Sequence, residues 1–213
     1  DRLMERQLDA RASVLLRETV EAKGIAVLLD AETAAIKGDH HAETVALEDG
    51  REIAADLVVV AAGIRANAGL GQGAGLEIGR GIIVDDNLQT SRANIFAIGE
   101  CAEHRGICYG LVEPAYEQAR VLAAHLSGAS ARYDGSVFAT NLKVSGVNVF
   151  SAGDFMGAPG TEQIVLTDPG LGTYKKLVIA NGRLVGTVLF GDTGDGLWYL
   201  ELIRSGASIA AIR

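Results

Sequence analysis

The sequence predicts an α/β protein that ends in a separate small α+β domain. Residues 57–62 are continuously apolar, which is typical of a strand buried on both faces of a sheet. Apolar residues recur at helical spacing after Asp9 and again after Glu113. Alternating runs flank Asn181-Gly182, the strongest hairpin signal in the chain. Buried strands and amphipathic helices therefore come first, and the pattern changes after Ser136.

The first sixty residues are predicted to form one helix and several short strands. Asp9 is a suitable N-cap, and Gly24 stands where a glycine commonly follows the end of a helix. A short strand is expected at residues 25–28. Three antiparallel strands are expected at residues 32–37, 43–47 and 51–54, separated by Gly38-Asp39 and Asp49-Gly50. The buried strand at residues 57–62 follows and ends at Gly63.

The middle of the chain is predicted to contain two short strands and one long helix. The strands are expected at residues 82–84 and 94–98, the second ending at Gly99-Glu100. The helix is expected to begin at Glu113-Pro114, with proline at the first helical position, and Gly128 ends it. Beyond residue 136 we expect paired strands at 141–150, the hairpin at 174–190 and a short helix at 195–204.

Composition excludes several classes of function. The formal net charge is −8, so the chain lacks the excess of cations that non-specific nucleic-acid binding requires. The longest apolar or glycine stretch, Leu57 to Ile64, is far shorter than the roughly 20 residues of a membrane span. Cys101 and Cys108 are too few for a disulfide scaffold or a four-ligand zinc site. We therefore expect reduced thiols, a cytoplasmic location, and neither nucleic acid nor membrane as a partner.

A glycine and a carboxylate follow the strand expected at residues 94–98. Gly99 has no Cβ, so its backbone can approach a ligand closely. Glu100 lies beyond the carboxyl end of that strand, where open α/β sheets bind ligands, and its carboxylate can accept hydrogen bonds from sugar or ribityl hydroxyls. The alternative interpretation is a plain strand end with a solvated glutamate.

The segment Thr90-x₅-Phe96-Ala97-x-Gly99-Glu100 resembles the second FAD motif, T-x₆-[FY]-A-x-G-D, of flavoprotein reductases with two dinucleotide-binding domains. Residues 57–67 are similar to their A-x-G-x-x-x-N crossover between the NAD(P)H and FAD domains. Four segments resemble more narrowly the large subunit of NAD(P)H-dependent nitrite reductases, namely residues 3–9, 99–106, 108–114 and 142–154. The resemblance extends from Leu3 to Arg213.

Two departures from the family pattern matter. Glu100 replaces the usual aspartate, and the nitrite reductase branch itself favours glutamate there. The two G-x-G-x-x-G loops of the family are absent, as are its cysteine-rich iron–sulfur module and its sirohaem-binding half. The resemblance therefore implies an internal fragment, with the loops before Asp1 and the metal centres after Arg213.

The resemblance also implies a domain division and a set of FAD-binding residues. Residues 1–63 are expected to complete the NAD(P)H-binding domain, 64–135 the second segment of the FAD-binding domain, and 136–213 the small α+β domain. Glu100 would bind the ribityl chain, and Gly99 would give it room. Glu113, Pro114 and Ala115 would open the helix whose positive end faces the flavin. Gly63 would lie near the boundary between the two cofactor domains.

The implied activity is electron transfer from NAD(P)H through FAD toward the reduction of nitrite to ammonium. Iron–sulfur and sirohaem centres outside this chain would complete the path, and nitrite and a small subunit would be partners, with a homo-oligomer also possible. No catalytic acid, base, nucleophile or metal ligand is expected among the 213 residues, because the flavin supplies the chemistry. The isolated chain is expected to be inactive and to hold FAD poorly.

Two other functions stay open. One is an NADH-dependent rubredoxin or ferredoxin reductase of the same superfamily, which we expect to carry a different domain after Ser136. The other is a non-enzymatic interface formed by residues 141–213. Four further motifs are assigned to structure rather than chemistry: the G-x-G-x-x-A at Gly69, the calcium-like loop at 192–201, His40-His41 in a turn, and the pair Cys101 and Cys108.

Overall fold

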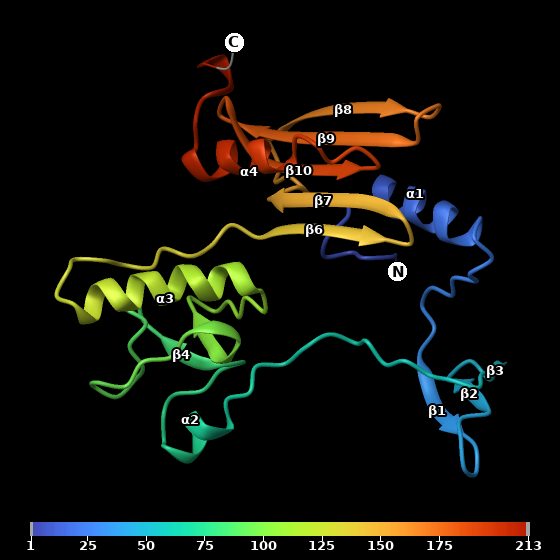
Figure 1. The fold of residues 1–213 in the computed structure, drawn as a ribbon, viewed down its shortest axis with the longest axis horizontal. Coiled ribbons are helices and arrows are strands. Elements are labelled where there is room, and N and C mark those ends of the chain that lie inside the picture. Colours follow the sequence, from blue (N-terminus) through green and yellow to red (C-terminus); the bar gives the residue numbers. More distant parts are fainter. Residues whose placement is uncertain (1, 212–213) are drawn as a thin grey trace. The chain divides into compact units, whose positions relative to one another are not determined.

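The computed structural model describes residues 2–211, and the chain divides into two compact units (Figure 1). The split unit combines the residues up to Val59 with those from Val137 onward. The middle unit consists of residues Val60–Ser136. These two units show which segments of the chain pack together. The division into an NAD(P)H-binding, an FAD-binding and a C-terminal domain, at residues 1–63, 64–135 and 136–213, stays a prediction.

The split unit is built on a five-stranded antiparallel sheet in the order β6-β7-β10-β9-β8 (Figure 1). The hairpin predicted at Asn181-Gly182 is confirmed, with both residues at positive φ as a two-residue turn of this type requires. The strands paired around Gly146 are also confirmed. The bounds are β6 Ala139–Val144, β7 Val147–Gly153, β8 Glu162–Asp168, β9 Thr173–Ala180 and β10 Arg183–Phe190. Strand β8 was not predicted, because all seven of its residues are exposed and no alternating pattern marks it.

Two helices cover opposite faces of this sheet. Helix α1, Ala10–Glu21, packs on a face that includes Val149 and Val188. Helix α4, Gly196–Ser205, packs through Leu200 on Phe150 and Leu189. Successive residues of a strand point to opposite faces, so neighbours such as Val149 and Phe150 enter different cores. The predicted helix at residues 195–204 is confirmed, and a 3₁₀ turn, η2 Ile209–Ala211, follows it.

A buried polar cluster joins the start of α1 to the sheet. Asp9 is the predicted N-cap, and its Oδ1 accepts a hydrogen bond from the Ala12 amide at 3.0 Å. Its Oδ2 accepts a 2.6 Å hydrogen bond from the Tyr174 hydroxyl and lies 3.4 Å from Lys176 Nζ. Burial and the Asp9 carboxylate both raise the pKa of Tyr174 above its ordinary value. One carboxylate thus caps the helix and fixes it to β9.

The three short antiparallel strands predicted near the N-terminus are confirmed. They are β1 Thr33–Lys37, β2 Thr44–Leu47 and β3 Glu52–Ala54, in the order β1-β2-β3. His40 and His41 lie in the exposed turn between the first two. This small sheet leaves most of its residues exposed.

Three predicted strands are wrong. Residues 57–62 form no strand, and Leu57 is 81% exposed. A strand buried on both faces needs neighbours on both sides, and no described residue pairs with this segment. Residues 25–28 likewise lack a partner. Residues 94–98 form a single bridge between Gln89 and Phe96, because they pair only with the short loop before them.

The middle unit contains a two-stranded parallel sheet and one long helix. Its elements are α2 Gly69–Gly73, β4 Ile82–Val84, the 3₁₀ helix η1 Gly99–Cys101, β5 Ala102–His104 and α3 Val112–Leu126. The strand predicted at 82–84 is confirmed as β4, which pairs with β5. Gly71 packs against the Ile82 side chain, where a Cβ would come within 2.8 Å, so this glycine of α2 serves packing.

A charged cluster in the middle unit is centred on Asp86. Asp86 accepts hydrogen bonds from the buried His104 at 2.9 Å, from Arg105 at 2.8 Å and from Arg132 at 3.0 Å. The His104 ring also lies 4.8 Å from that of Tyr133. The hydrogen bonds from Arg105 and His104 hold the pKa of Asp86 well below its usual range.

None of the helices between Arg2 and Ala211 combines the length and the apolar character that a membrane-spanning segment needs. In the same stretch, His, Cys, Asp and Glu side chains nowhere gather in groups of three or more as metal ligands would.

Substitution Tyr174→Phe is expected to lower the free energy of unfolding by about 1–3 kcal/mol, because the buried Asp9 carboxylate loses a hydrogen-bond donor. Chemical denaturation measures this change. Tyr116→Phe is the matched control, since the Tyr116 side chain is largely exposed and should tolerate the loss of its hydroxyl. Equal stability of the two variants would contradict the role of this cluster.

Substitution Asp86→Asn is expected to destabilise the fold near pH 7, and by progressively less as the pH falls from about 4 toward 2. The pKa of Asp86 is lower in the folded chain than the ordinary value of about 3.9, so its contribution is present above that pH and disappears as acid protonates the folded carboxylate. The difference between the denaturation midpoints of the two proteins should be constant down to about pH 4 and should narrow from there toward pH 2. The exposed Asp56→Asn is the control, and a gap that stays constant would refute the assignment.

Candidate functional site

The Gly99–Glu100 turn lies directly against α3. Gly99 has a φ of +79°, a backbone conformation that residues with a Cβ rarely adopt. A Cβ built on it would come within 3.8 Å of the Ala115 Cβ. Glu100 follows within η1, and its side chain is exposed. Two segments that the sequence analysis assigned to one site, Gly99–Glu100 and the beginning of the helix, are therefore adjacent.

The N-cap residue of α3, Leu111, offers no side-chain acceptor to the backbone donors of the first turn. The helix begins at Val112, one residue before the predicted start, and its N-cap Leu111 makes no side-chain hydrogen bond. Pro114 is buried in the first turn, where its missing N–H costs nothing. The first amides of a helix lack intrahelical acceptors, and the dipole gives this end a partial positive charge. An electronegative ligand group is therefore favoured at this end.

Gln118 connects the turn to the helix, and the sequence analysis missed it. Its Oε1 accepts a 2.6 Å hydrogen bond from the Gly99 amide, and the residue is fully buried. It lies three residues after Ala115, so both side chains project from one face of α3. The signal in the sequence was a polar residue between the apolar positions Ala115 and Leu122 of the predicted stripe.

Gly63 lies near the same end of the helix. It adopts a φ of +92°, and a Cβ there would meet open space. The next residue, Ile64, approaches Gly110 so closely that a Cβ on Gly110 would come within 2.7 Å of the Ile64 Cδ1. Gly110 precedes the first residue of α3 by two positions. The structure therefore brings the expected residues Gly63, Gly99, Glu100, Glu113, Pro114 and Ala115 into one part of the middle unit.

The two cysteines flank this region as free thiols. The Cys101 thiol lies 3.4 Å from the Ile98 carbonyl oxygen. Burial and the neighbouring Glu103 carboxylate raise the pKa of Cys108, which weakens it as a nucleophile. Glu103 also accepts hydrogen bonds from the amides of Arg80 and Gly81, at 2.5 and 3.0 Å. These contacts are those of a structural loop.

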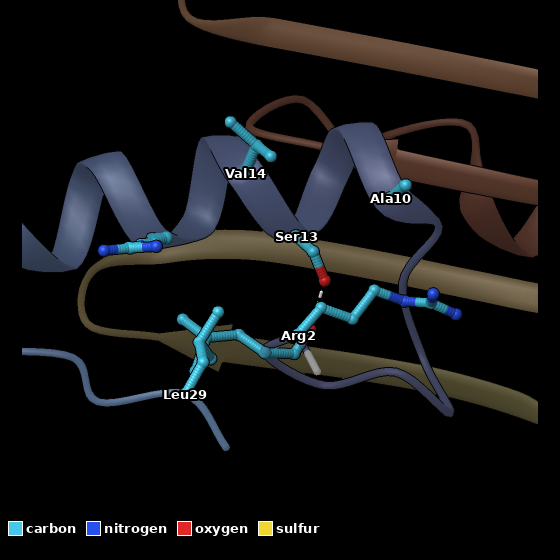
Figure 2. A pocket seen from close by; sticks show the side chains of 7 residues that line it. Arg2, Ala10, Ser13, Val14 and Leu29 are labelled. Atoms are coloured by element: carbon cyan, nitrogen blue, oxygen red, sulfur yellow. Dashed lines mark hydrogen bonds between the residues drawn. The ribbon is translucent and has the colours of Figure 1, made fainter. Parts of the chain in front are cut away.

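Pockets in the split unit do not include the expected residues. One pocket of about 280 Å³ lies along α1, where Ser13 donates to the Leu3 carbonyl (Figure 2). It is lined by Arg2, Leu3, Ala10, Ser13, Val14, Arg17 and Leu29. A second, of similar size, lies beside Asp168 and Lys175. Lys175 also pairs with Asp192 and Asp195, so these two carboxylates of the calcium-like loop bind an ammonium group.

The residues of the middle unit fit part of a flavin site. The Gly99 turn packs closely against α3, the exposed Glu100 carboxylate suits hydroxyl groups, and the first amides of α3 suit an electron-rich ring edge. No residue in this part of the chain forms a glycine-rich loop at the start of a long helix, so the pyrophosphate of FAD has no such partner among residues 60–136.

Comparisons with known proteins identify the family and the relatives of this chain. Residues 1–125 match the family model described as pyridine nucleotide-disulphide oxidoreductase, and residues 139–207 match the rubredoxin NAD+ reductase C-terminal domain. The chain is 50% identical over 209 residues to a nitrite reductase [NAD(P)H] of Bacillus subtilis, covering 98% of this chain and 26% of that protein. An assimilatory nitrate reductase electron transfer subunit of the same organism is 44% identical, with 91% and 25% covered.

A solved structure shows the same fold. An NAD-dependent persulfide reductase from A. fulgidus is 27% identical, with a TM-score of 0.83 over 99% of this chain and 44% of that one. The chain spans about a quarter of the length of the curated relatives named above. The resemblance to nitrite reductase large subunits predicted from sequence motifs is confirmed.

One expectation is corrected by these matches. We expected rubredoxin reductases to carry a different domain after Ser136, but residues 139–207 match the domain named for those enzymes. That domain therefore does not separate the two classes of reductase. The chain belongs to the pyridine nucleotide-disulphide oxidoreductase family, and it carries a C-terminal domain of the rubredoxin NAD+ reductase type.

Proposed function

We propose that this chain is part of a flavoprotein reductase that passes electrons from NAD(P)H through FAD toward the reduction of nitrite to ammonium. The oxidoreductase family is established by the family match, and 50% identity to a nitrite reductase [NAD(P)H] supports the narrower assignment. The contact of the Gly99–Glu100 turn with the start of α3 is the observation that carries the proposal, because it unites the two segments assigned to flavin.

Each residue of the proposed site has a binding role rather than a chemical one. Bound FAD supplies the redox chemistry between NAD(P)H and the next acceptor. The Glu100 carboxylate accepts hydrogen bonds from ribityl hydroxyls, and Gly99 leaves room for them. The first turn of α3, formed by Glu113, Pro114 and Ala115, directs its amides toward the electron-rich edge of the ring system. Gly63 lies where the chain passes between the two cofactor domains.

Further partners follow from the same proposal. Nitrite is the small-molecule substrate, and a small subunit and iron–sulfur and sirohaem centres outside this chain complete the electron path. A homo-oligomer in a cytoplasmic location is part of the proposal. The match of residues 139–207 favours one second candidate, a reductase that delivers electrons to a small redox protein such as rubredoxin. An NAD(P)H oxidation assay of the complete protein with each acceptor separates the two.

Substitution Glu100→Ala in the complete protein is expected to weaken FAD binding about 10- to 100-fold, because a hydrogen bond to a charged group contributes about 1.5–3 kcal/mol. Equilibrium dialysis against FAD measures the change. Glu162→Ala, on the exposed strand β8, is the matched control and should retain the wild-type affinity. An unchanged FAD affinity in Glu100→Ala would contradict the assigned role.

The isolated 213-residue chain is expected to purify without a stoichiometric flavin and to show no NAD(P)H oxidation. Glu100 and α3 supply contacts to only part of FAD, and a dinucleotide is usually held through its pyrophosphate at a glycine-rich turn. The visible absorption spectrum of the purified chain, in the region of the flavin bands, tests this expectation. A stoichiometric flavin band would show that the pyrophosphate contacts are not required.

A further inference from the structure

Gln118 occupies a position on α3 that an apolar residue would ordinarily fill. It is fully buried, and Val121 and Leu122, on the next turn of the helix, pack in the core of the middle unit. A buried amide costs free energy unless both its oxygen and its nitrogen find partners. An apolar side chain of similar volume would avoid that cost, so the amide needs a specific explanation.

Only one end of this amide is satisfied. The Gly99 N–H can only donate, so the group 2.6 Å from it must be the oxygen Oε1. The Nε2 group is buried, and among the described residues it has no partner that meets the ordinary geometry of a hydrogen bond. It lies beside the Tyr133 hydroxyl, whose pKa burial raises to about 12 while Ser136 and Gln118 act in the opposite direction. The hydrogen bond to Gly99 is therefore the contact that Gln118 gains from burial.

The Gly99 amide is a group that needs an acceptor. It begins the 3₁₀ helix η1, and the first amides of a helix have no intrahelical partner. Gly99 also has few steric limits on its backbone, so its φ of +79° must be selected by contacts. Because Glu100 follows directly, the orientation of the Gly99 backbone determines where the Glu100 carboxylate points.

We infer that Gln118 is a positioning residue for the proposed flavin site: by accepting the Gly99 N–H, it holds the Gly99–Glu100 turn against the first turns of α3. Being buried, it acts through Gly99 and Glu100 and does not touch the cofactor. The nature of the ligand rests on the proposed function, whereas the hydrogen bond and its effect on the turn do not.

Amide hydrogen exchange of Gly99 tests the hydrogen bond in the chain itself. Gln118→Met keeps the side-chain volume but removes the oxygen, so exchange at Gly99 should become about tenfold faster. Gln118→Glu retains an acceptor oxygen and should exchange more slowly than Gln118→Met. Gln163→Met, on exposed β8, is the control and should match the wild type. Unchanged exchange in Gln118→Met would overturn the inference.

A second variant covers the case in which Gln118→Met does not fold. Gln118→Asn withdraws the oxygen by one methylene and should show the same loss of protection at Gly99. Wild-type exchange in Gln118→Asn would overturn the inference as well.

FAD binding by the complete protein tests the positioning role. Gln118→Met should bind FAD about tenfold more weakly, and Gln118→Glu should recover most of that loss. Faster exchange at Gly99 with an unchanged FAD affinity would refute the positioning role and leave the proposed function intact. If the wild-type complete protein takes up no FAD, the proposed function fails and the positioning role fails with it, even where the exchange result holds.

Discussion

The candidate site depends on one backbone contact, the approach of the Gly99 turn to α3. A 2.6 Å hydrogen bond and a small-residue contact with Ala115 hold the turn there. A residue larger than alanine at position 115 would crowd this contact, and a residue with a Cβ at position 99 would be strained at a φ of +79°. Because Glu100 follows the turn and the first amides of α3 lie one turn before Gln118, this contact places a carboxylate and a positive helix end in the same region.

The split unit is stabilised mainly by apolar cores on the two faces of its sheet. Its five-stranded sheet buries apolar residues on both faces, with α1 on one and α4 on the other (Figure 1). The polar cluster of Asp9, Tyr174 and Lys176 ties α1 to β9 across 165 residues of sequence. The N-terminal helix therefore depends for its burial on a sheet formed at the other end of the chain.

Much of the fold could be predicted from local patterns. The Asn181-Gly182 hairpin, the Asp9 cap and the helix beginning near Pro114 each carry their signal within a few residues. Residues 57–62 could not be predicted correctly in the same way, because an apolar run forms a strand only where neighbouring strands are available to pair with it. Strand β8 was missed because its residues carry no alternating apolar pattern, and it forms a strand through its pairing with β9.

The candidate site shows the same contrast between residues marked by local sequence signals and residues defined by long-range contacts. Glu100 and Pro114 were found from motif spacing, whereas Gln118 lies on the buried face of a helix and contacts a residue 19 positions away.

The most direct test of the account is the structure of the complete protein loaded with FAD. The account predicts that the Glu100 carboxylate lies within about 2.5–3.0 Å of a ribityl hydroxyl, with the flavin ring edge at the first turn of α3. FAD bound with neither segment in contact would contradict it.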